Sequence, residues 1–263
     1  MRPPTIYIET AMSDEKKTAL VTNAAGYAGP PAVTALSDAG FRVFVHDATF
    51  TDPVAIAQFL QVHPAAEVIC ADNPATLVTE AWKTAGKINA IVCNDHYPAV
   101  QISSEKASLD EFGQTLEVLV LNPFALLQAA IPLLRDQGGG NIVMITSCRT
   151  HAPIQGGAIP DAARAAANAL VKSLAVELAP DAIAVNAVSP NFLYSEAYYP
   201  KAIFIDNEKG KDYVTKNVPA GRLGRPDEIG DVIRFLASTE ARFLTGAIID
   251  FNGGWPSSSV RPT

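Results

Sequence analysis

The stretch TALVTNAAGYAGPPAVTALSDAG (residues 18–40) decides the fold. Its first six residues, 18–23, form a short run with an apolar centre, which is typical of a buried strand. A loop of small residues follows, and two prolines then open a helical pattern that ends at Gly40. A strand, a small-residue loop and a helix in this order form the first half of a βαβ unit, whose next strand lies parallel to the first.

The rest of the chain repeats this alternation of strand and helix. Further strands are predicted over residues 42–47, 67–72, 88–95, 141–147, 183–190 and 246–254, and helices over 57–63, 74–86, 108–138, 161–179 and 226–238. The alternation predicts a Rossmann-like, doubly wound α/β fold, with a seven-stranded parallel sheet and helices on both faces. We expect a single domain over 17–263, preceded by a flexible extension over 1–16.

Two of the predicted segments depart from this simple pattern. Pro123 lies inside the long helix over 108–138 and is expected to bend it. The segment 191–217 is too long for a plain connection, so we expect an irregular binding loop that lies over the ends of the strands.

Composition excludes several classes of function. The 263 residues carry a net charge of -7, and no basic run is longer than a pair, which argues against binding to nucleic acid or to anionic membranes. The three cysteines are widely spaced and form no metal-binding pattern. No apolar run reaches the ~20 residues that span a membrane, and the N-terminus does not have the long apolar core of a signal peptide. We therefore expect a soluble, cytoplasmic protein that holds no metal.

The loop after the first predicted strand is unusual for a nucleotide site. Ligands of such sheets bind beyond the carboxyl ends of the strands, and a dinucleotide needs glycines there so that main-chain N–H groups can approach its pyrophosphate. Asn23 and Tyr27 stand where two of these glycines would be. We expect the Tyr27 ring to occupy the space of a dinucleotide; a loop that merely tolerates a tyrosine is the alternative.

The first loop also carries a family resemblance. Thr22, Tyr27 and Gly29 match the pattern T-x4-[FY]-x-G. With the fragments VHDATF, CNDHY, SPNFLYSE, VPAGRLGRPDEIG and FNGGWP, the chain resembles the short-chain dehydrogenase/reductase superfamily over nearly its whole length. Within that superfamily it is most similar to the halohydrin dehalogenases. The resemblance implies that the protein uses no cofactor and that a halide pocket fills the space of the nicotinamide.

A second pattern of that family, S-x12-Y-x3-R, is matched only at its two ends. The resemblance places the serine at Ser147 and the arginine at Arg164, whereas Pro160 stands where the family has its catalytic tyrosine. In the family the tyrosine moves the proton, the serine holds the substrate oxygen and the arginine favours the phenolate. Asp95 resembles the aspartate that orients the arginine. The implied reactions are the conversion of vicinal haloalcohols to epoxides and halide, and the opening of epoxides by azide, cyanide or nitrite.

The halide site that the resemblance implies is the turn after the sixth predicted strand, with a tyrosine of the first loop as its wall. Its expected residues are Tyr27, Pro190, Asn191, Phe192, Leu193 and Tyr199. Main-chain N–H groups aimed at a departing halide lower the barrier to its release; an ordinary loop turn is the alternative. The resemblance also implies a homotetramer, in which Trp255 of the tail reaches a neighbouring subunit.

Pro160 leaves the proton transfer open. Proline fits the first turn of a helix, and Asp161 suits its positive end, so we expect the fold to tolerate the change. Three explanations remain: the tyrosine was replaced or lost and the enzyme is impaired, another group has taken over, or the protein binds a ligand without converting it. The groups that could take over are His96, His151, Asp161, Tyr97, Tyr194, Tyr198 and Tyr199.

Two other residues and a rival function complete the expectations. Arg164 lies in an alanine-rich helix and needs a partner for its charge, which we expect to be Asp95. Ser147 has a simpler interpretation as the residue that caps the turn after its strand. The rival to a carbon–halogen lyase is an NAD(P)-dependent short-chain oxidoreductase, which the sheet favours and which Asn23 and Tyr27 oppose.

Overall fold

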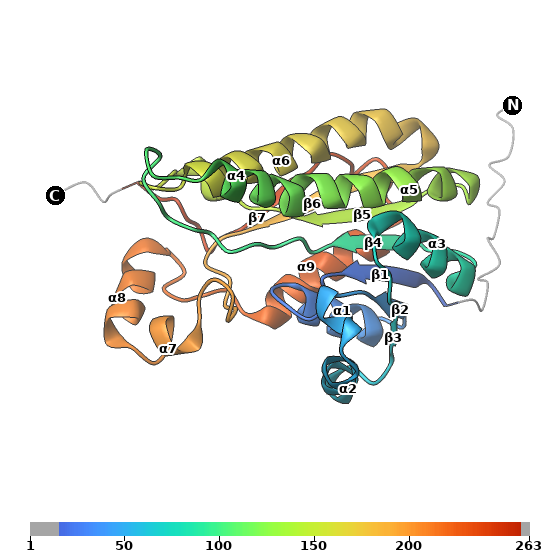
Figure 1. Cartoon of the computed structure of the whole chain (residues 1–263), viewed down its shortest axis with the longest axis horizontal. Coiled ribbons are helices and arrows are strands. Elements are labelled where there is room, and N and C mark those ends of the chain that lie inside the picture. Colours follow the sequence, from blue (N-terminus) through green and yellow to red (C-terminus); the bar gives the residue numbers. More distant parts are fainter. Residues whose placement is uncertain (1–15, 259–263) are drawn as a thin grey trace, which may run out of the picture.

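The computed structural model describes residues 16–258. All seven predicted strands form one parallel sheet in the order β3-β2-β1-β4-β5-β6-β7 (Figure 1). They are β1 (Thr18–Thr22), β2 (Arg42–Val45), β3 (Ala66–Val68), β4 (Ala90–Cys93), β5 (Gly140–Ile145), β6 (Ile183–Pro190) and β7 (Ile248–Phe251). The predicted seven-stranded α/β fold is confirmed. The predicted extension 1–16 lies, except for its last residue, outside the described residues.

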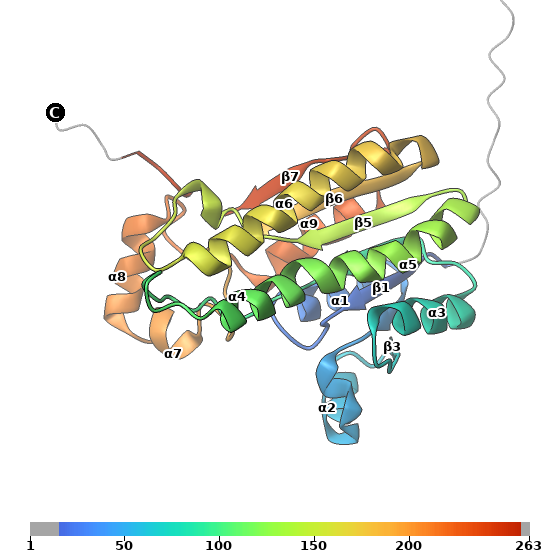
Figure 2. The same cartoon turned by 45° about the horizontal axis from the view of Figure 1, so that its top comes forward.

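Helices cover both faces of the sheet (Figure 2). One face carries α1 (Gly29–Asp38), α2 (Pro53–Val62) and α9 (Pro226–Ser238), and the other carries α3 (Pro74–Ala85), α5 (Asn122–Asp136) and α6 (Ala158–Leu178). Two apolar cores result, one on each side of the sheet. Val33 and Ile229 lie in the first core, and Leu127 and Leu174 lie in the second. Short 3₁₀ turns lie at Ala48–Thr51, Arg149–His151 and Ala179–Asp181.

The strand order places a crevice at one edge of the sheet. After β3 the chain crosses over β1 and β2 to begin β4 on the far side of β1. The segments that leave β1 and β4 therefore turn in opposite directions, and a crevice opens beyond the carboxyl ends of these strands. This is the edge of the sheet at which the loops that follow β1, β4, β5 and β6 meet.

The long helix predicted over 108–138 is divided in three. It consists of α4 (Leu109–Leu116), a π-helical turn (Glu117–Leu121) and α5. Pro123 has no amide hydrogen and its ring crowds the preceding turn, so the regular i to i−4 pattern fails there and the helix widens. The expected distortion near Pro123 is therefore present as a wide turn just before the proline.

The same helical run corrects the expectation that no segment is long and apolar enough to span a membrane. Leu109–Asp136 meets that requirement by length and composition, with a hydropathy of 1.7 in its most apolar window. Leu126, Leu127 and Leu134 of this run are nonetheless buried in the core against the sheet. Core helices of soluble proteins pass the same test, so the finding carries no assignment to a membrane.

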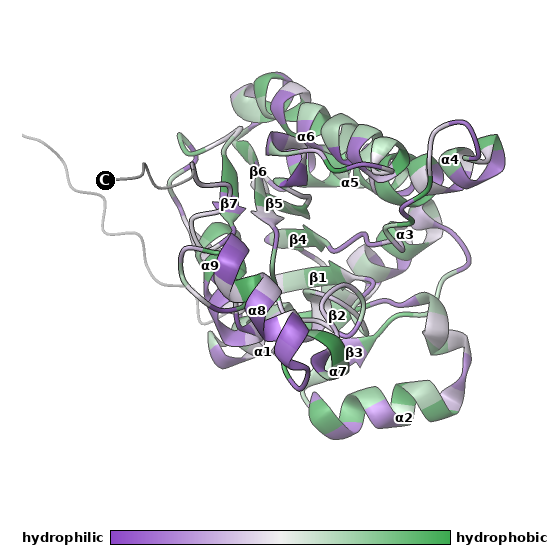
Figure 3. Ribbon diagram, turned by 90° about the vertical axis from the view of Figure 1, so that its left-hand side faces the viewer, coloured by the Kyte–Doolittle hydropathy of each residue, from purple (hydrophilic) through white to green (hydrophobic). Residues whose placement is uncertain are grey.

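The segment 191–217 is more ordered than expected. It contains two short helices, α7 (Lys201–Phe204) and α8 (Glu208–Asn217), which stand beyond the carboxyl ends of the strands. Val214 packs inward on Phe192, and the outer surface of α8 is largely hydrophilic (Figure 3). The prediction of a cover over the strand ends is correct, whereas its irregular character is wrong, because Asn207 caps α8 through its side chain.

Candidate active site

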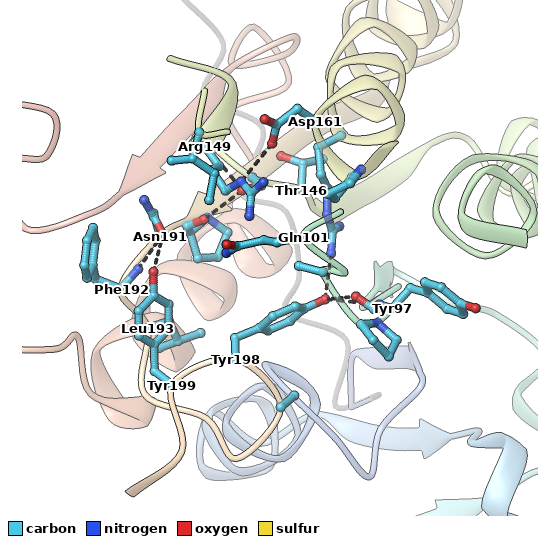
Figure 4. A pocket seen from close by; sticks show the side chains of 18 of the residues that line it. Tyr97, Gln101, Thr146, Arg149, Asp161, Asn191, Phe192, Leu193, Tyr198 and Tyr199 are labelled. Carbon is cyan, nitrogen blue, oxygen red and sulfur yellow. Dashed lines mark hydrogen bonds and ion pairs between the residues drawn. The ribbon is translucent and has the colours of Figure 1, made fainter. Parts of the chain in front are cut away.

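A cavity of about 730 Å³ lies beyond the carboxyl ends of the strands (Figure 4). Its wall comes from the loops that follow β1, β4, β5 and β6 and from the first turn of α6. Nine of the ten predicted site residues line it: Tyr27, Ser147, Pro160, Arg164, Pro190, Asn191, Phe192, Leu193 and Tyr199. The tenth, Asp95, lies behind Arg164. The sequence therefore predicted which residues meet at this cavity.

Ser147 follows β5 and links two strand ends. Its hydroxyl donates to the main-chain carbonyl of Pro190 at 3.2 Å, and its oxygen accepts a hydrogen bond from the main-chain N–H of Arg149, also at 3.2 Å. The second contact is the turn cap that the simpler interpretation expected. Because Ser147 also faces the cavity, its hydroxyl can exchange the Pro190 carbonyl for an oxygen of a bound ligand.

Pro160 lies in the first turn of α6 and is buried. The helix begins at Ala158, three residues earlier than predicted. The first amides of a helix have no acceptor within the helix, so the missing N–H of Pro160 costs no hydrogen bond there. Asp161 does more than suit the helix end, because its carboxylate accepts a hydrogen bond from Nε of Arg149 at 2.8 Å. The expected tolerance of the fold for Pro160 is confirmed.

Arg164 is buried and satisfied mainly by main-chain oxygens. Its Nη1 donates to the carbonyls of Asp95 at 3.1 Å and Ile145 at 3.2 Å, and its Nη2 donates to the hydroxyl of Tyr198 at 3.3 Å. Asp95 is therefore the predicted partner of Arg164, but it contacts Arg164 through its main-chain carbonyl and not through its carboxylate. The Asp95 carboxylate turns to the first loop, where it accepts a hydrogen bond from Nδ2 of Asn23 at 2.9 Å.

The Asp95 carboxyl group is unusually basic for an aspartate. Burial raises its pKa to about 7, against the opposing effects of the Arg164 cation and the Asn23 hydrogen bond. An acid in this state changes charge near neutral pH. It lies behind the cavity, so its charge acts on ligands through Arg164 and the first loop.

Tyr198 was one of several tyrosines that the sequence offered as a replacement for the missing phenol, and the structure places it in the cavity wall. Its hydroxyl donates to the carbonyl of Tyr97 at 2.7 Å and accepts hydrogen bonds from the N–H of Tyr97 at 3.1 Å and from Arg164. Its ring crosses the cavity toward Tyr97 and meets the Tyr27 ring edge-on at 4.9 Å (Figure 4). The contact between Tyr198 and Tyr97 joins the loops after β4 and β6. The spacing of residues in the sequence does not predict a contact between two separate loops.

The first loop has a geometry of its own. Asn23 and Tyr27 both have positive φ angles, 49° and 52°. A Cβ at Gly29 would lie 2.6 Å from the Ala24 carbonyl oxygen, which explains the glycine of the first-loop pattern. The Tyr27 ring lines the cavity, and burial raises the pKa of its hydroxyl far above the ordinary value.

The turn after β6 lines the cavity and holds most of its main-chain donors in hydrogen bonds of its own. Phe192 has a φ of 56°, and its N–H donates to Oδ1 of Asn191 at 3.0 Å, which also accepts the Tyr199 hydroxyl at 2.8 Å. Among residues 16–258, the N–H of Leu193 finds no acceptor. Of the main-chain N–H groups expected to face a halide, that of Asn191 is bonded to the Phe251 carbonyl and that of Phe192 to the Asn191 side chain, so Leu193 is the one that remains.

Three remaining expectations concern the histidines and the tail. Neither histidine lines the cavity: His96 lies with Nδ1 3.2 Å from the Asn94 carbonyl, and His151 is exposed, 3.6 Å from the Asp250 carboxylate. Burial lowers the pKa of His96. Trp255 packs edge-on against Phe192 of its own chain at 5.9 Å, and its expected contact with a neighbouring subunit stays a prediction.

A family model described as enoyl-(acyl carrier protein) reductase matches residues 24–256. The chain belongs to the short-chain dehydrogenase/reductase superfamily. Among curated members of this superfamily, the human dehydrogenase/reductase SDR family member 4 is 28% identical over 187 residues, which are 71% of this chain and 66% of the human protein. The chain thus matches about two thirds of the length of that relative.

Solved structures of the superfamily give nearer matches. A protein described as a dehalogenation enzyme is 37% identical, with a TM-score of 0.88, and the match covers 92% of this chain and 98% of that one. A halohydrin dehalogenase bound to ethyl (2S)-oxiran-2-ylacetate is 29% identical, with a TM-score of 0.90 and coverage of 94% and 100%. The superfamily members most similar in structure thus include dehalogenases, while the curated relative is named for oxidation and reduction.

Proposed function

We propose that this chain is a carbon–halogen lyase of the halohydrin dehalogenase type, which converts vicinal haloalcohols to epoxides and halide and opens epoxides with small anions. One observation carries the proposal. The cavity that holds Ser147 and Arg164 is bounded on one side by the Tyr27 ring and on another by the turn with the free Leu193 N–H. Polar groups for an oxygen and a main-chain donor for an anion thus line one cavity.

The first loop supports a reaction without nicotinamide. Asp47, which follows β2, accepts hydrogen bonds from the N–H groups of Ala25 at 2.9 Å and Thr49 at 3.0 Å. In dinucleotide enzymes the acidic group near this place binds the ribose. Here it holds its own chain, while Tyr27 fills the cavity side of the loop and the His96 ring touches Gly26. These residues do not fit a nicotinamide dinucleotide.

The proposed chemistry assigns one task to each end of the cavity. The Ser147 hydroxyl binds the substrate oxygen, and the buried Arg164 cation stabilises the negative charge that develops on that oxygen. The oxygen attacks the neighbouring carbon as the carbon–halogen bond breaks. The halide leaves toward the N–H of Leu193 and the aromatic wall formed by Phe192 and Tyr199. Proline at position 160 has no proton to exchange, so the base is a group outside the family's usual position.

The first test measures bromide released from small vicinal bromoalcohols, with the spontaneous rate subtracted. The chain should release bromide, and Arg164→Gln should reduce kcat/KM by about 100-fold, because a buried charge in the site is lost. Arg234→Gln is the matched control, since Arg234 is exposed and pairs with Asp231 on the surface of α9. Absence of bromide release from the folded chain and from a Pro160→Tyr variant would contradict the proposal.

An NAD(P)-dependent oxidoreductase is the second candidate, because the family model and the curated relative point to that class. Titration of NADH fluorescence separates the two. We expect no saturable binding at micromolar protein, since Tyr27 and Asp47 leave no room for the coenzyme. Tight binding of NADH would overturn the lyase proposal in favour of the oxidoreductase.

A further inference from the structure

The cavity has no phenol at position 160, so the groups that could exchange a proton were compared by their contacts. Asp161 is committed to Arg149 through a 2.8 Å ion pair. Tyr199 donates its hydrogen to Asn191. Tyr27 makes no hydrogen bond through its hydroxyl among the described residues, and burial opposes its ionisation. Among the described residues, none of these three groups accepts a hydrogen bond from the buried Arg164 cation.

Tyr198 differs because its oxygen contacts the buried arginine. Nη2 of Arg164 donates to it at 3.3 Å, and the N–H of Tyr97 donates to it at 3.1 Å. A cation and a main-chain donor on one phenol oxygen both stabilise the charge that remains when the proton leaves. The oxygen thus has, from a loop after β6, the surroundings that a phenol in the first turn of α6 would otherwise share with Arg164.

We propose that Tyr198 is the catalytic acid/base of this chain, forming with Arg164 a phenol–guanidinium pair in place of the one lost at Pro160. The inference rests on the proposed function, whose oxygen-binding end it completes. Tyr198, Arg164 and Ser147 all line the same cavity. A substrate oxygen held by Ser147 therefore lies in the same enclosed space as the phenol oxygen.

The proton and electron balance is simple. Tyr198 as phenolate takes the hydroxyl proton of the haloalcohol, the freed oxygen forms a bond to the neighbouring carbon, and the halogen leaves with the electron pair of its bond. The phenol then passes the proton to water. In epoxide opening the anion forms a bond to one ring carbon, the C–O bond at that carbon breaks, and the phenol gives its proton to the ring oxygen; water then returns a proton to the phenolate. The Tyr198 hydrogen points to the Tyr97 carbonyl in the structure, and rotation about the C–O bond turns it toward a substrate.

The test uses bromide release by the full chain and by five variants. Tyr198→Phe keeps the ring and should reduce kcat by about 100-fold or more, the usual contribution of a positioned acid/base. Tyr194→Phe is the matched control on the same loop, since the Tyr194 hydroxyl contacts Glu196 outside the cavity, and it should stay within twofold. Pro160→Tyr in the Tyr198→Phe background should recover at least tenfold over Tyr198→Phe, because a second phenol then reaches Arg164.

Rescue separates proton transfer from a merely structural role of the Tyr198–Tyr97 contact. If Tyr198→Phe keeps more than a third of the activity, or if Pro160→Tyr is active alone but does not rescue Tyr198→Phe, the inference is overturned. If Pro160→Tyr disables the chain by itself, the pH profile of kcat/KM decides. Loss of a limb of that profile in Tyr198→Phe supports the inference, and an unchanged shape overturns it.

The experiments distinguish a failure of the Tyr198 assignment from a failure of the proposed dehalogenase function. An inactive natural chain that becomes active as Pro160→Tyr would overturn the role of Tyr198 while leaving the dehalogenase function standing. Inactivity of both proteins, with circular dichroism showing both folded, would remove the function itself. Larger loss in Tyr27→Phe than in Tyr198→Phe would move the proton to Tyr27 and also overturn the inference.

Discussion

Arg149 and Asp161 form an ion pair across the wall of the cavity, with Nε and Oδ1 2.8 Å apart. The pair ties the turn that follows β5 to the first turn of α6. Both side chains are more than four-fifths buried, at 17% and 14% exposure. A pair in this position fixes the distance between Ser147, which precedes it, and the helix that carries Arg164.

Removing one partner should destabilise the chain. Asp161→Asn leaves the Arg149 cation buried without its carboxylate, and we expect the free energy of unfolding in urea to fall by about 1–3 kcal/mol. Asp212→Asn is the control, because the Asp212–Lys216 pair is exposed and its loss should not change the urea midpoint. Equal midpoints for Asp161→Asn and the unaltered chain would show that the pair does not hold the wall.

The two glycine positions 29 and 113 should respond to alanine in opposite directions. A Cβ at Gly29 would lie 2.6 Å from the Ala24 carbonyl oxygen, so Gly29→Ala should lower the free energy of unfolding by about 1–3 kcal/mol. Gly113 lies exposed in α4 with nothing within 4 Å of its Cβ position, so Gly113→Ala should raise it by about 0.5–1 kcal/mol. Thermal denaturation of both variants checks the pair; a shared sign would refute the steric account of the first-loop pattern.

Asp95 predicts a specific dependence of stability on pH. Its pKa rises from 3.8 to about 7 on folding because of burial, so the folded state binds its proton more tightly than the unfolded state. The contribution of Asp95 to stability is therefore complete below about pH 4 and is lost as the pH rises to about 7. Three pH units correspond to roughly 4 kcal/mol as an upper bound.

Comparison with Asp95→Asn isolates this effect, because all other groups are shared. The variant should gain stability relative to the unaltered chain as the pH rises from 4 to 7, with no further gain above about pH 8. Urea denaturation at pH 4.5, 6, 7 and 8 measures the difference. A difference that stays constant over this range would mean that Asp95 ionises normally in the folded chain.

The π-helical turn and the start of α5 expose apolar side chains that predict how the chain assembles. Leu121 and Phe124 near the π-helical turn are 51% and 39% exposed, although both are large and apolar. We propose that a second copy covers them in a homotetramer, since exposed apolar patches mark association sites. Light scattering should give four times the 27.8 kDa chain mass, and a Leu121→Asp/Phe124→Asp variant should give a smaller species. Val62→Asp, on exposed α2, is the control; a monomeric unaltered chain would refute the proposal.

The elements were predictable where the sequence carries a period or a cap. β6 and α9 have the predicted bounds, because a mainly apolar run that ends at Pro190 defines the first and Pro226 with its acidic neighbours opens the second. The nine cavity residues were predictable because the resemblance to the dehalogenase family names them, and they meet because parallel strands bring the loops that follow them to one edge of the sheet. The contact of Arg164 with the Asp95 main-chain carbonyl and that of Tyr198 with Tyr97 were not predictable. Both depend on how two loops fold against each other. α7 and α8 were missed because they pack mainly on each other and on nearby residues within the segment 191–217, which covers the strand ends.

Gly26, Tyr27 and Asp47 together bear on any attempt to redesign this protein for coenzyme-dependent chemistry. Exchanging the tyrosine for glycine would clear one obstruction, yet the His96 ring would still lie beside Gly26 and the Asp47 carboxylate would still accept hydrogen bonds from the N–H groups of Ala25 and Thr49. Such a conversion needs concerted replacement of several side chains, and no single step on that route restores the binding surface. Conversion of the first loop to a coenzyme-binding loop therefore requires changes to its hydrogen bonds as well as to its side chains.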